Sequence, residues 1–332
     1  MLRVHFTAED LARVRVSAGP DYLWEISNSV QTLQRTDGTR VFGEWRRWAR
    51  PRLPESCGLL SPLLPPHGCS PDFLTPACGD RESLPAAVDA LVRTPRPRLR
   101  ADLQRVAASR RLPEWTTSLA DGDSGALRQL AQVLHAYHQE VLAPFWQRVH
   151  AHIDADRALR VHGLLDGAVD GLLAGLGPRF RWRPPVLEAD YPVEHELRLN
   201  GRGLLLQPSF FCWPTPVTLS DGALPPVLVY PIDHESGWSR PGAPGRPGGG
   251  AALGQLIGHT RAAVLSAAGT GASTVELARL LGVTHPAVSQ HVKVLRAAGL
   301  VTTARRAGRA LHVTTSEGRA LLRSGERGGG AA

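Results

Sequence analysis

The stretch STVELARLLGVTHPAVSQHVKVLRAAGLVTTARRAGRALHVTT, residues 273–315, constrains the fold of this chain more than any other segment. Ser273 with Glu276 three residues later is a capping box, which predicts the start of a helix. Gly282 favours a tight turn, and Thr284 is typical of the cap of a following helix. The segment therefore predicts two helices joined by a short turn, with the second helix over residues 284–298.

The second of these helices has two chemically different faces. Val288, Val292 and Leu295 recur at helical spacing and predict an apolar face that is turned inward. On the other face, Gln290 can pair with adenine and Lys293 suits a phosphate group. The predicted contact residues on the two helices are Ser273, Thr274, Thr284, His285, Ala287, Ser289, Gln290 and Lys293.

A small hairpin is predicted after the second helix. Two short strands, Leu300–Thr303 and Ala310–Thr314, lie on either side of the sequence ARRAGR. Arg305, Arg306 and Arg309 would then lie on the loop of the hairpin, against a phosphate backbone or in a minor groove. Helices followed by such a hairpin predict a winged helix-turn-helix.

Positive charge is concentrated in the same part of the chain. From residue 252 onward there are ten basic and three acidic side chains, a net charge of +7, against +8 for the whole chain. A basic quarter of this kind attracts a polyanion. Together with the order of the helices and strands, this charge distribution predicts double-stranded DNA as a partner.

Composition divides the chain into parts. Residues 233–251 are rich in Gly and Pro and predict a flexible linker. Before the linker, residues 1–232 predict an α+β domain that is helix-rich with a small sheet. After it, residues 252–324 predict the winged helix-turn-helix domain, and residues 325–332 a disordered tail. Residues 252–332 contain no Phe, Trp or Tyr, so their core must be aliphatic. A first helix of this domain is expected over Ala252–Ala267, and a short last helix over SEGRALLR.

The first 232 residues contain both helical and strand patterns. Leu2–Phe6 predicts a strand, and Thr7 with Asp10 a helix cap. The apolar residues Leu23, Ile26, Val30 and Leu33 predict a helix that begins at Pro20 and Asp21. The prolines of residues 40–85 predict irregular structure, whereas residues 98–108 and 124–176 are helical in pattern, with a kink or break at Pro144. From residue 180 to 232 short strands are expected, and the segments EHELRL and GLLLQP predict a hairpin or a short loop around Asn200-Gly201.

The run His150, His152, Asp154 and Asp156 is the strongest candidate for chemistry in the first 232 residues. It could bind a metal ion on a strand or loop. On a helix, positions two apart point to different faces, which favours surface pairs of His150 with Asp154 and of His152 with Asp156. No phosphate loop or hydrolase motif is present. We therefore expect no catalytic centre, no metal and no bound cofactor.

Three of the four cysteines, Cys57, Cys69 and Cys78, lie with His67 in a proline-rich stretch. Their spacing contains no C-x-x-C pair and matches no common zinc pattern. Isolated thiols are favoured over a redox or metal site, which stays an open alternative. The sequence shows no secretory signal and no apolar run of about 20 residues, so a soluble cytoplasmic protein without a membrane partner is expected.

The residues from Thr274 to Thr315 resemble the winged-helix domain of ArsR-type bacterial repressors. The resemblance implies a homodimer on a palindromic operator, made by the helices that flank the motif, and a repressor released by an inducer. The family's metal-binding cysteines are absent from the helix TVELARLL. The long N-terminal region resembles an uncharacterised extension of some ArsR-like regulators, and it would sense a small-molecule effector or build the dimer.

Two other functions remain open from the sequence. The N-terminal region could be an enzyme or ligand-binding domain that the winged helix recruits to a partner. Alternatively, the winged helix could bind protein, although an adaptor would be expected to expose apolar anchors. The predicted outward face is polar instead, which favours a DNA-binding regulator.

Overall fold

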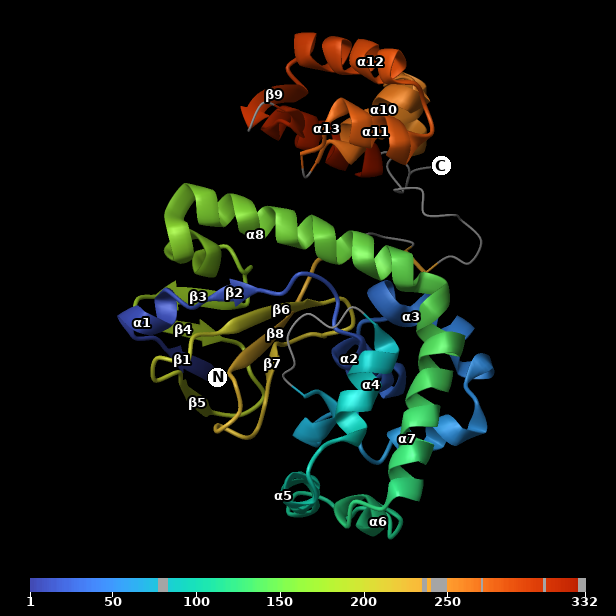
Figure 1. Cartoon of the computed structure of the whole chain (residues 1–332), viewed down its shortest axis with the longest axis vertical. Helices are drawn as coiled ribbons and strands as arrows, with labels where there is room; N and C mark the ends of the chain where they lie inside the picture. The colour runs from blue at the N-terminus through green and yellow to red at the C-terminus, as the bar shows by residue number, and fades with distance from the viewer. Residues whose placement is uncertain (77–82, 235–237, 240–249, 270, 307–308, 328–332) are drawn as a thin grey trace. The chain divides into compact units, whose positions relative to one another are not determined.

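The computed structural model describes residues 1–76, 83–234, 238–239, 250–269, 271–306 and 309–327. The chain divides into two compact units, Met1–His234 and Glu235–Ala332 (Figure 1). Most of the predicted linker 233–251 lies outside the described residues. Among the described helices, none combines the length and the apolar character needed to cross a lipid bilayer.

Two four-stranded sheets form one side of the first unit (Figure 1). The first sheet has the order β3-β4-β1-β5, with strands Phe180–Arg183, Val186–Ala189, Leu2–His5 and His195–Arg198. The second has the order β2-β6-β8-β7, with strands Arg15–Val16, Leu205–Ser209, Val227–Pro231 and Val217–Thr218. β1 pairs in parallel with β5, and β6 pairs in parallel with both β2 and β8. The expected small sheet is therefore two sheets, each held together partly by strands distant in sequence.

The hairpin predicted around Asn200-Gly201 does not form. β5 and β6 belong to different sheets, so the alternative of a short loop between strands is the one observed. Asn200 and Gly201 both have positive φ, 53° and 80°, as a tight turn requires. The backbone N–H of Gly203 then donates to the carboxylate of Asp10 at 2.9 Å. The strand that follows, β6, pairs with β2 in the second sheet and not with β5.

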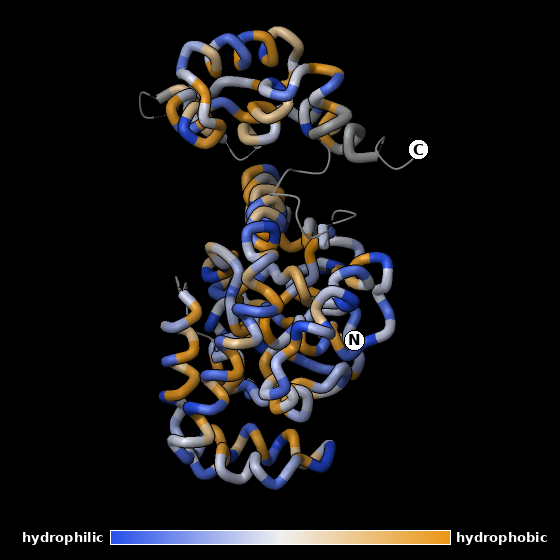
Figure 2. Tube along the Cα trace, turned by 90° about the vertical axis from the view of Figure 1, so that its right-hand side faces the viewer, coloured by the Kyte–Doolittle hydropathy of each residue, from blue (hydrophilic) through white to orange (hydrophobic). Residues whose placement is uncertain are grey.

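Eight α-helices of the first unit are described, and several of them lie beside the sheets in Figure 1. They are α1 Ala8–Leu11, α2 Tyr22–Gln34, α3 Thr39–Ala49, α4 Leu84–Val92, α5 Arg96–Ala107, α6 Thr116–Ala120, α7 Ser124–Tyr137 and α8 Trp146–Ala174. The predicted helix cap at Thr7 and Asp10 is confirmed, as is the burial of the α2 residues Leu23, Ile26, Val30 and Leu33. In Figure 2 the helices alternate between hydrophobic and hydrophilic residues along their length, as one-sided burial requires.

The prediction of irregular structure over residues 40–85 is wrong at its beginning, where α3 lies. The many charged residues of this helix obscure its apolar positions, of which Phe42 and Trp45 are fully buried. Arg46 is also buried. Its guanidinium donates to the backbone carbonyls of Thr32 and Asp37, which offsets part of the cost of burying the charge. A side chain that normally marks a surface thus caps the end of α2. Short 3-10 helices follow α3, as the prolines suggested.

The break predicted at Pro144 is confirmed. A π-helical turn, His138–Leu142, and a 3-10 turn, Ala143–Phe145, separate α7 from α8. Since Pro144 has no N–H and its ring clashes with the preceding turn, the α-helical bond pattern cannot continue through it. The apolar stripe continues across the break, because Leu134, Val141 and Ile153 are all buried.

α8 contains a second break that the sequence analysis missed. Gly167 and Ala168 have non-helical backbone angles, and the end of the helix folds back on the preceding part (Figure 1). The two arms meet where Gly163 and Gly171 face each other without side chains. The spacing of glycines in this helix was the available signal, since glycine lowers helix stability and allows close backbone contact.

Substitution of Gly171 by Ala should separate the two arms of α8. The added Cβ would collide with the backbone carbonyl oxygen of Gly163, and overpacking of this kind costs about 1–3 kcal/mol. Urea unfolding followed by tryptophan fluorescence measures this loss, because seven of the eight tryptophans precede residue 233. Gly222→Ala is the matched control, since its Cβ would meet nothing within 4 Å. Equal stability of the two variants would contradict the proposed contact.

A buried carboxylate joins α2 to the end of β6. Glu25 has no exposed surface, and its oxygens accept from the backbone N–H groups of Phe210 and Phe211 at 2.9 and 3.0 Å. Burial raises the pKa of Glu25 to about 7, although the two amide hydrogen bonds act in the opposite direction. The carboxyl group therefore holds the backbone of residues 210–211. Because its pKa is raised, the stability of the first unit depends on pH.

Glu25→Gln should remove a pH-dependent part of the stability of the first unit. The folded-state pKa lies above the ordinary value of 4.5, so the folded protein binds the extra proton between these values. The contribution is fully present below the unfolded pKa and is lost as pH rises through about 7. Between about pH 5 and about pH 8, the stability of the wild type relative to Glu25→Gln should fall by roughly 1–3 kcal/mol. Denaturant unfolding at several pH values measures this, with the exposed Glu114→Gln as control. A pH-independent difference would contradict the assignment.

The second unit is built from five helices and one two-stranded antiparallel sheet in its described residues. They are α9 Gly250–Ile257, α10 His259–Ala267, α11 Thr274–Leu281, α12 His285–Ala297, β9 Val301–Arg306, β10 Arg309–Thr314 and α13 Ser316–Arg327. The predicted aliphatic core is confirmed by the buried residues Leu253, Ala262, Val264, Leu265, Ala268, Leu277, Ala278, Val288, Val292, Leu295 and Val301. The last helix, expected over SEGRALLR, continues to Arg327 and so extends into the predicted tail 325–332; residues 328–332 lie outside the described part.

The single helix predicted over Ala252–Ala267 is in fact two helices. The chain turns at Gly258, which has φ 91° and ψ 137°. The apolar spacing of Leu253, Val264 and Leu265 extends through the turn and hid it, because these residues are buried in the same core. The local signal for the break was Gly258 itself, because glycine readily adopts a positive φ.

Candidate nucleic-acid interface

α11 and α12 are joined by a tight turn of three residues. Ser273 and Glu276 form the predicted capping box at the start of α11, with reciprocal backbone and side-chain hydrogen bonds. Gly282 ends α11 in the left-handed conformation, with φ 65° and ψ 28°. The backbone N–H of Val283 then donates to the carbonyl of Ala278 at 3.1 Å. Thr284 precedes α12 as predicted, although its side chain makes no capping hydrogen bond.

The two predicted faces of α12 are confirmed by burial. Val288, Val292 and Leu295 are at most 4% exposed and pack into the core. The residues Thr284, His285, Ser289, Gln290 and Lys293 are exposed, and Ala287 is half-buried. α12 therefore presents hydroxyl, imidazole, amide and ammonium groups along one side, which can bond to base edges and phosphates.

The two predicted contact residues at the start of α11 are less available. Ser273 is half-buried, and its hydroxyl takes part in the capping box with Glu276. Thr274 is also half-buried, and its hydroxyl bonds to the ring of His312 at 2.9 Å. Both residues hold α11 in place, and the exposed residues of α12 form the larger polar surface.

The hairpin after α12 is longer than predicted. β9 and β10 pair in antiparallel register from Val301 with Thr314 to Arg306 with Arg309. The backbones of Arg305, Arg306 and Arg309 therefore belong to the strands, whereas the sequence placed them on the loop. The side chains of these three arginines lie outside the described residues.

His312 on β10 is a residue that the sequence analysis did not single out. It is 6% exposed, and its two ring nitrogens bond to the hydroxyls of Thr274 and Thr303, each at 2.9 Å. Burial, and to a smaller degree the cation of Arg296, lowers the pKa of His312. The ring therefore links the start of α11 to the hairpin as a neutral imidazole. No local pattern of residues indicates this role, because Thr274 lies 38 residues away on another element.

The His/Asp run of the first unit lies on α8, as the helical interpretation predicted, but the expected His–Asp pairs are not what holds the acids. Asp154 bonds to Arg157 at 3.2 Å, and Asp156 bonds to Arg160 and to the hydroxyl of Tyr230. Each arginine lies three or four residues after its acid, so the two side chains are neighbours on the helix surface and can pair. Within the described part, no three His, Cys, Asp or Glu side chains are grouped as metal ligands would be.

The cysteines of the proline-rich stretch differ in environment. Cys57 is buried, and burial raises the pKa of its thiol to about 11, whereas Cys69 is exposed. A thiol with a raised pKa is a poor nucleophile and metal ligand. Cys78 lies outside the described residues, so the joint role left open for the three cysteines stays untested.

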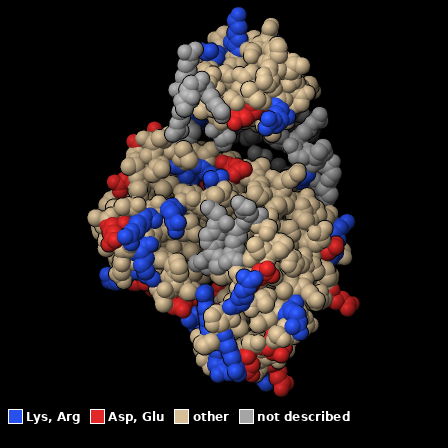
Figure 3. Space-filling model, in the orientation of Figure 1, with Lys and Arg blue, Asp and Glu red and all other residues tan. Residues whose placement is uncertain are grey.

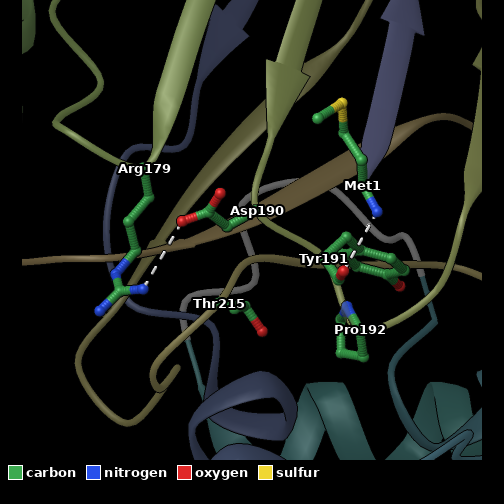
Figure 4. A pocket seen from close by; sticks show the side chains of 6 residues that line it. All are labelled: Met1, Arg179, Asp190, Tyr191, Pro192 and Thr215. Carbon is green, nitrogen blue, oxygen red and sulfur yellow. Dashed lines mark hydrogen bonds and ion pairs between the residues drawn. The ribbon is translucent and has the colours of Figure 1, made fainter.

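The first unit also has a surface hollow of about 450 Å³, shown in Figure 4. It is lined by Met1, Arg179, Asp190, Tyr191, Pro192 and Thr215. Arg179 and Asp190 approach each other at its rim, at 3.8 Å. Its volume lies within the range of small-molecule sites, and part of its polar lining is already paired, since the ammonium group of Met1 donates to the carbonyl of Tyr191.

Comparison with protein families gives one finding, on the second unit. Residues 259–304 match a family model described as a helix-turn-helix domain. The second unit contains a helix-turn-helix domain. The matched residues run from the start of α10 into β9, and so include the capping box, the turn at Gly282 and the whole of α12. No curated protein and no solved structure matches the chain.

The conformation of Gly282 gives a direct test of the turn. Gly282→Ala should destabilise the helix-turn-helix by about 1 kcal/mol, because a residue with a side chain is strained at φ 65° although space for a Cβ exists. Gly282→Asn should cost less, since Asn tolerates this conformation. Amide hydrogen exchange over α11 and α12 measures the effect, because residues 252–332 hold no aromatic fluorophore. Equal exchange in the wild type and Gly282→Ala would contradict the assigned turn.

Proposed function

We propose that the chain is a transcriptional regulator that binds double-stranded DNA through its second unit, as a winged helix-turn-helix. The observation that carries the proposal is the exposed polar side of α12 in a domain that matches the helix-turn-helix family. α12 would lie in the major groove. The β9–β10 hairpin would be the wing, with Arg305, Arg306 and Arg309 against the backbone or minor groove.

The distribution of charge supports DNA as the partner. Ten basic and three acidic residues follow residue 251, whereas the preceding 251 residues are almost neutral in sum. On the visible face of the first unit, basic and acidic side chains are interspersed (Figure 3). A polyanion is therefore attracted mainly to the domain that holds α12.

The resemblance to ArsR-type repressors extends the proposal to a homodimer on a palindromic operator. In that arrangement α9, α10 and α13 would form the dimer interface. Leu256 on α9 supports this, because an aliphatic side chain that is 74% exposed is the kind of group that an interface covers. Repression, rather than activation, rests on the resemblance alone.

The first unit would control the second unit by sensing a small-molecule effector or by stabilising the dimer, through the Gly/Pro-rich linker 233–251. The hollow beside Tyr191 is a candidate effector site by its volume. We propose no enzyme activity, since the acids of the His/Asp run are occupied by Arg157, Arg160 and Tyr230. No observation favours an enzyme recruited by the winged helix.

The DNA-binding proposal is tested by the affinity of the full chain for duplexes from the region upstream of its own gene, over a series of salt concentrations. Binding should weaken steeply with salt, by about 0.9 in the logarithmic slope for each phosphate contact. A flat response or no binding would overturn the proposal. Tryptophan fluorescence with added metabolites would test the effector role separately.

Variants of α12 should divide into two kinds. Gln290→Ala should relax sequence preference at one base pair by about 1–3 kcal/mol, because its amide would read a base edge. Lys293→Ala should weaken binding to all sequences and lower the salt slope by about 1, because its ammonium would bind a phosphate. Arg111→Ala is the matched control, since this exposed residue belongs to the first unit and to neither the proposed contact face nor the proposed dimer interface. If Arg111→Ala had the same effects as the two α12 variants, the proposed face would be wrong.

A further inference from the structure

The side chain of His312 connects two elements that the proposed function requires to act together. Its ring bonds to Thr274 at the start of α11 and to Thr303 on β9, and it has little exposed surface. A neutral imidazole has one donor and one acceptor nitrogen, and a hydroxyl can serve either. Both ring nitrogens are therefore hydrogen-bonded in a buried position. An apolar side chain at position 312 would leave the hydroxyls of Thr274 and Thr303 without this partner.

The backbone around His312 strengthens the same connection. His312 and Ala272 exchange two backbone hydrogen bonds, of 3.0 and 2.9 Å, in an isolated antiparallel bridge. Two residues further along β10, the Thr314 hydroxyl donates to the carbonyl of Leu265 at 2.7 Å. β10 is thus attached to the end of α10 and to the segment that leads into α11.

The attachment lies at the base of the hairpin. His312 pairs with Thr303, and Arg309 pairs with Arg306 three positions nearer to the tip. At 3.3–3.4 Å per residue, this separation is about 10 Å. A change in the angle of the hairpin at His312 therefore moves the backbone of Arg306 and Arg309 by a distance that grows with this separation.

We propose that His312 is a positioning residue that holds the hairpin at a fixed angle to α11 and α12, so that hairpin and helix contact one DNA duplex together. This role rests on the proposed DNA-binding function. It assigns His312 no contact with DNA. Its ring acts through Thr274 and Thr303, and the hairpin arginines make the phosphate contacts that depend on it.

The test compares the salt dependence of DNA binding in His312→Phe, His312→Gln and the wild type. Phe fills the space but cannot bond to either threonine, so the hairpin should lose its fixed angle and its phosphate contacts. The logarithmic salt slope should then fall by about 2–3, at about 0.9 for each contact of Arg305, Arg306 and Arg309. Gln has a donor and an acceptor and should restore most of the slope.

Val264→Ala controls for a loss of stability alone. Val264 is fully buried on α10, so its truncation destabilises the core without removing a bond to the hairpin. Lower stability reduces the folded fraction but leaves the number of phosphate contacts in the complex unchanged. The salt slope of Val264→Ala should therefore equal that of the wild type. An unchanged slope in His312→Phe as well would overturn the positioning role.

Hydrogen exchange without DNA separates this inference from the proposed function. In His312→Phe, the backbone amides of residues 272 and 312 should exchange faster than in the wild type, whereas those of α12 should keep their protection. Unchanged protection at residues 272 and 312 would overturn the inference even if the wild type binds DNA. Absence of salt-dependent binding by the wild type would instead overturn the proposed function and, with it, the role in DNA contact.

Discussion

Burial of one side of α12 is the interaction on which the architecture of the second unit depends. Val288, Val292 and Leu295 are held in an aliphatic core, and each buried side chain of this size contributes about 1.5–3 kcal/mol. Because a helix that buries one side must expose the other, this packing alone places Ser289, Gln290 and Lys293 outward. Gly282, in the left-handed conformation, ends α11 and allows the chain to turn into α12 within three residues.

Several buried acids play an analogous part in the first unit, where they bind backbone amides. Asp10 accepts from Gly203, Glu25 from Phe210 and Phe211, and Asp72 from Ser220 and Asp221. In each case an acid from the first third of the chain holds a loop or strand end between residues 203 and 221. Carboxylates that bind backbone amides in this way stabilise the fold of the first unit.

The helix-turn-helix was predictable because its signals are local. The Ser273–Glu276 box, the glycine at 282 and the apolar spacing of α12 each act within a few residues, and all are present in the structure. The match of residues 259–304 agrees with them. In the first unit the break at Pro144 was equally local, since proline alone prevents the helix from continuing.

What the sequence could not supply depends on contacts between distant residues. β6 pairs with β2, and just before β6 the amide of Gly203 bonds to Asp10, 193 positions away. α3 was hard to predict because its buried Arg46 is polar, and its partners are the carbonyls of Thr32 on α2 and of Asp37 on the loop after α2. His312 was missed for the same reason, since its two partners lie 38 and 9 residues away.

Photo-cross-linking from α12 would test most directly the claim that its exposed side contacts DNA. A photoreactive amino acid in place of the exposed Ser289 should cross-link to duplex DNA in the full-length protein, and the yield should fall as salt is raised. The same group in place of Ala263, half-buried on α10, should give little product. Equal yields from the two positions, or none from position 289 under conditions in which DNA is bound, would contradict the account.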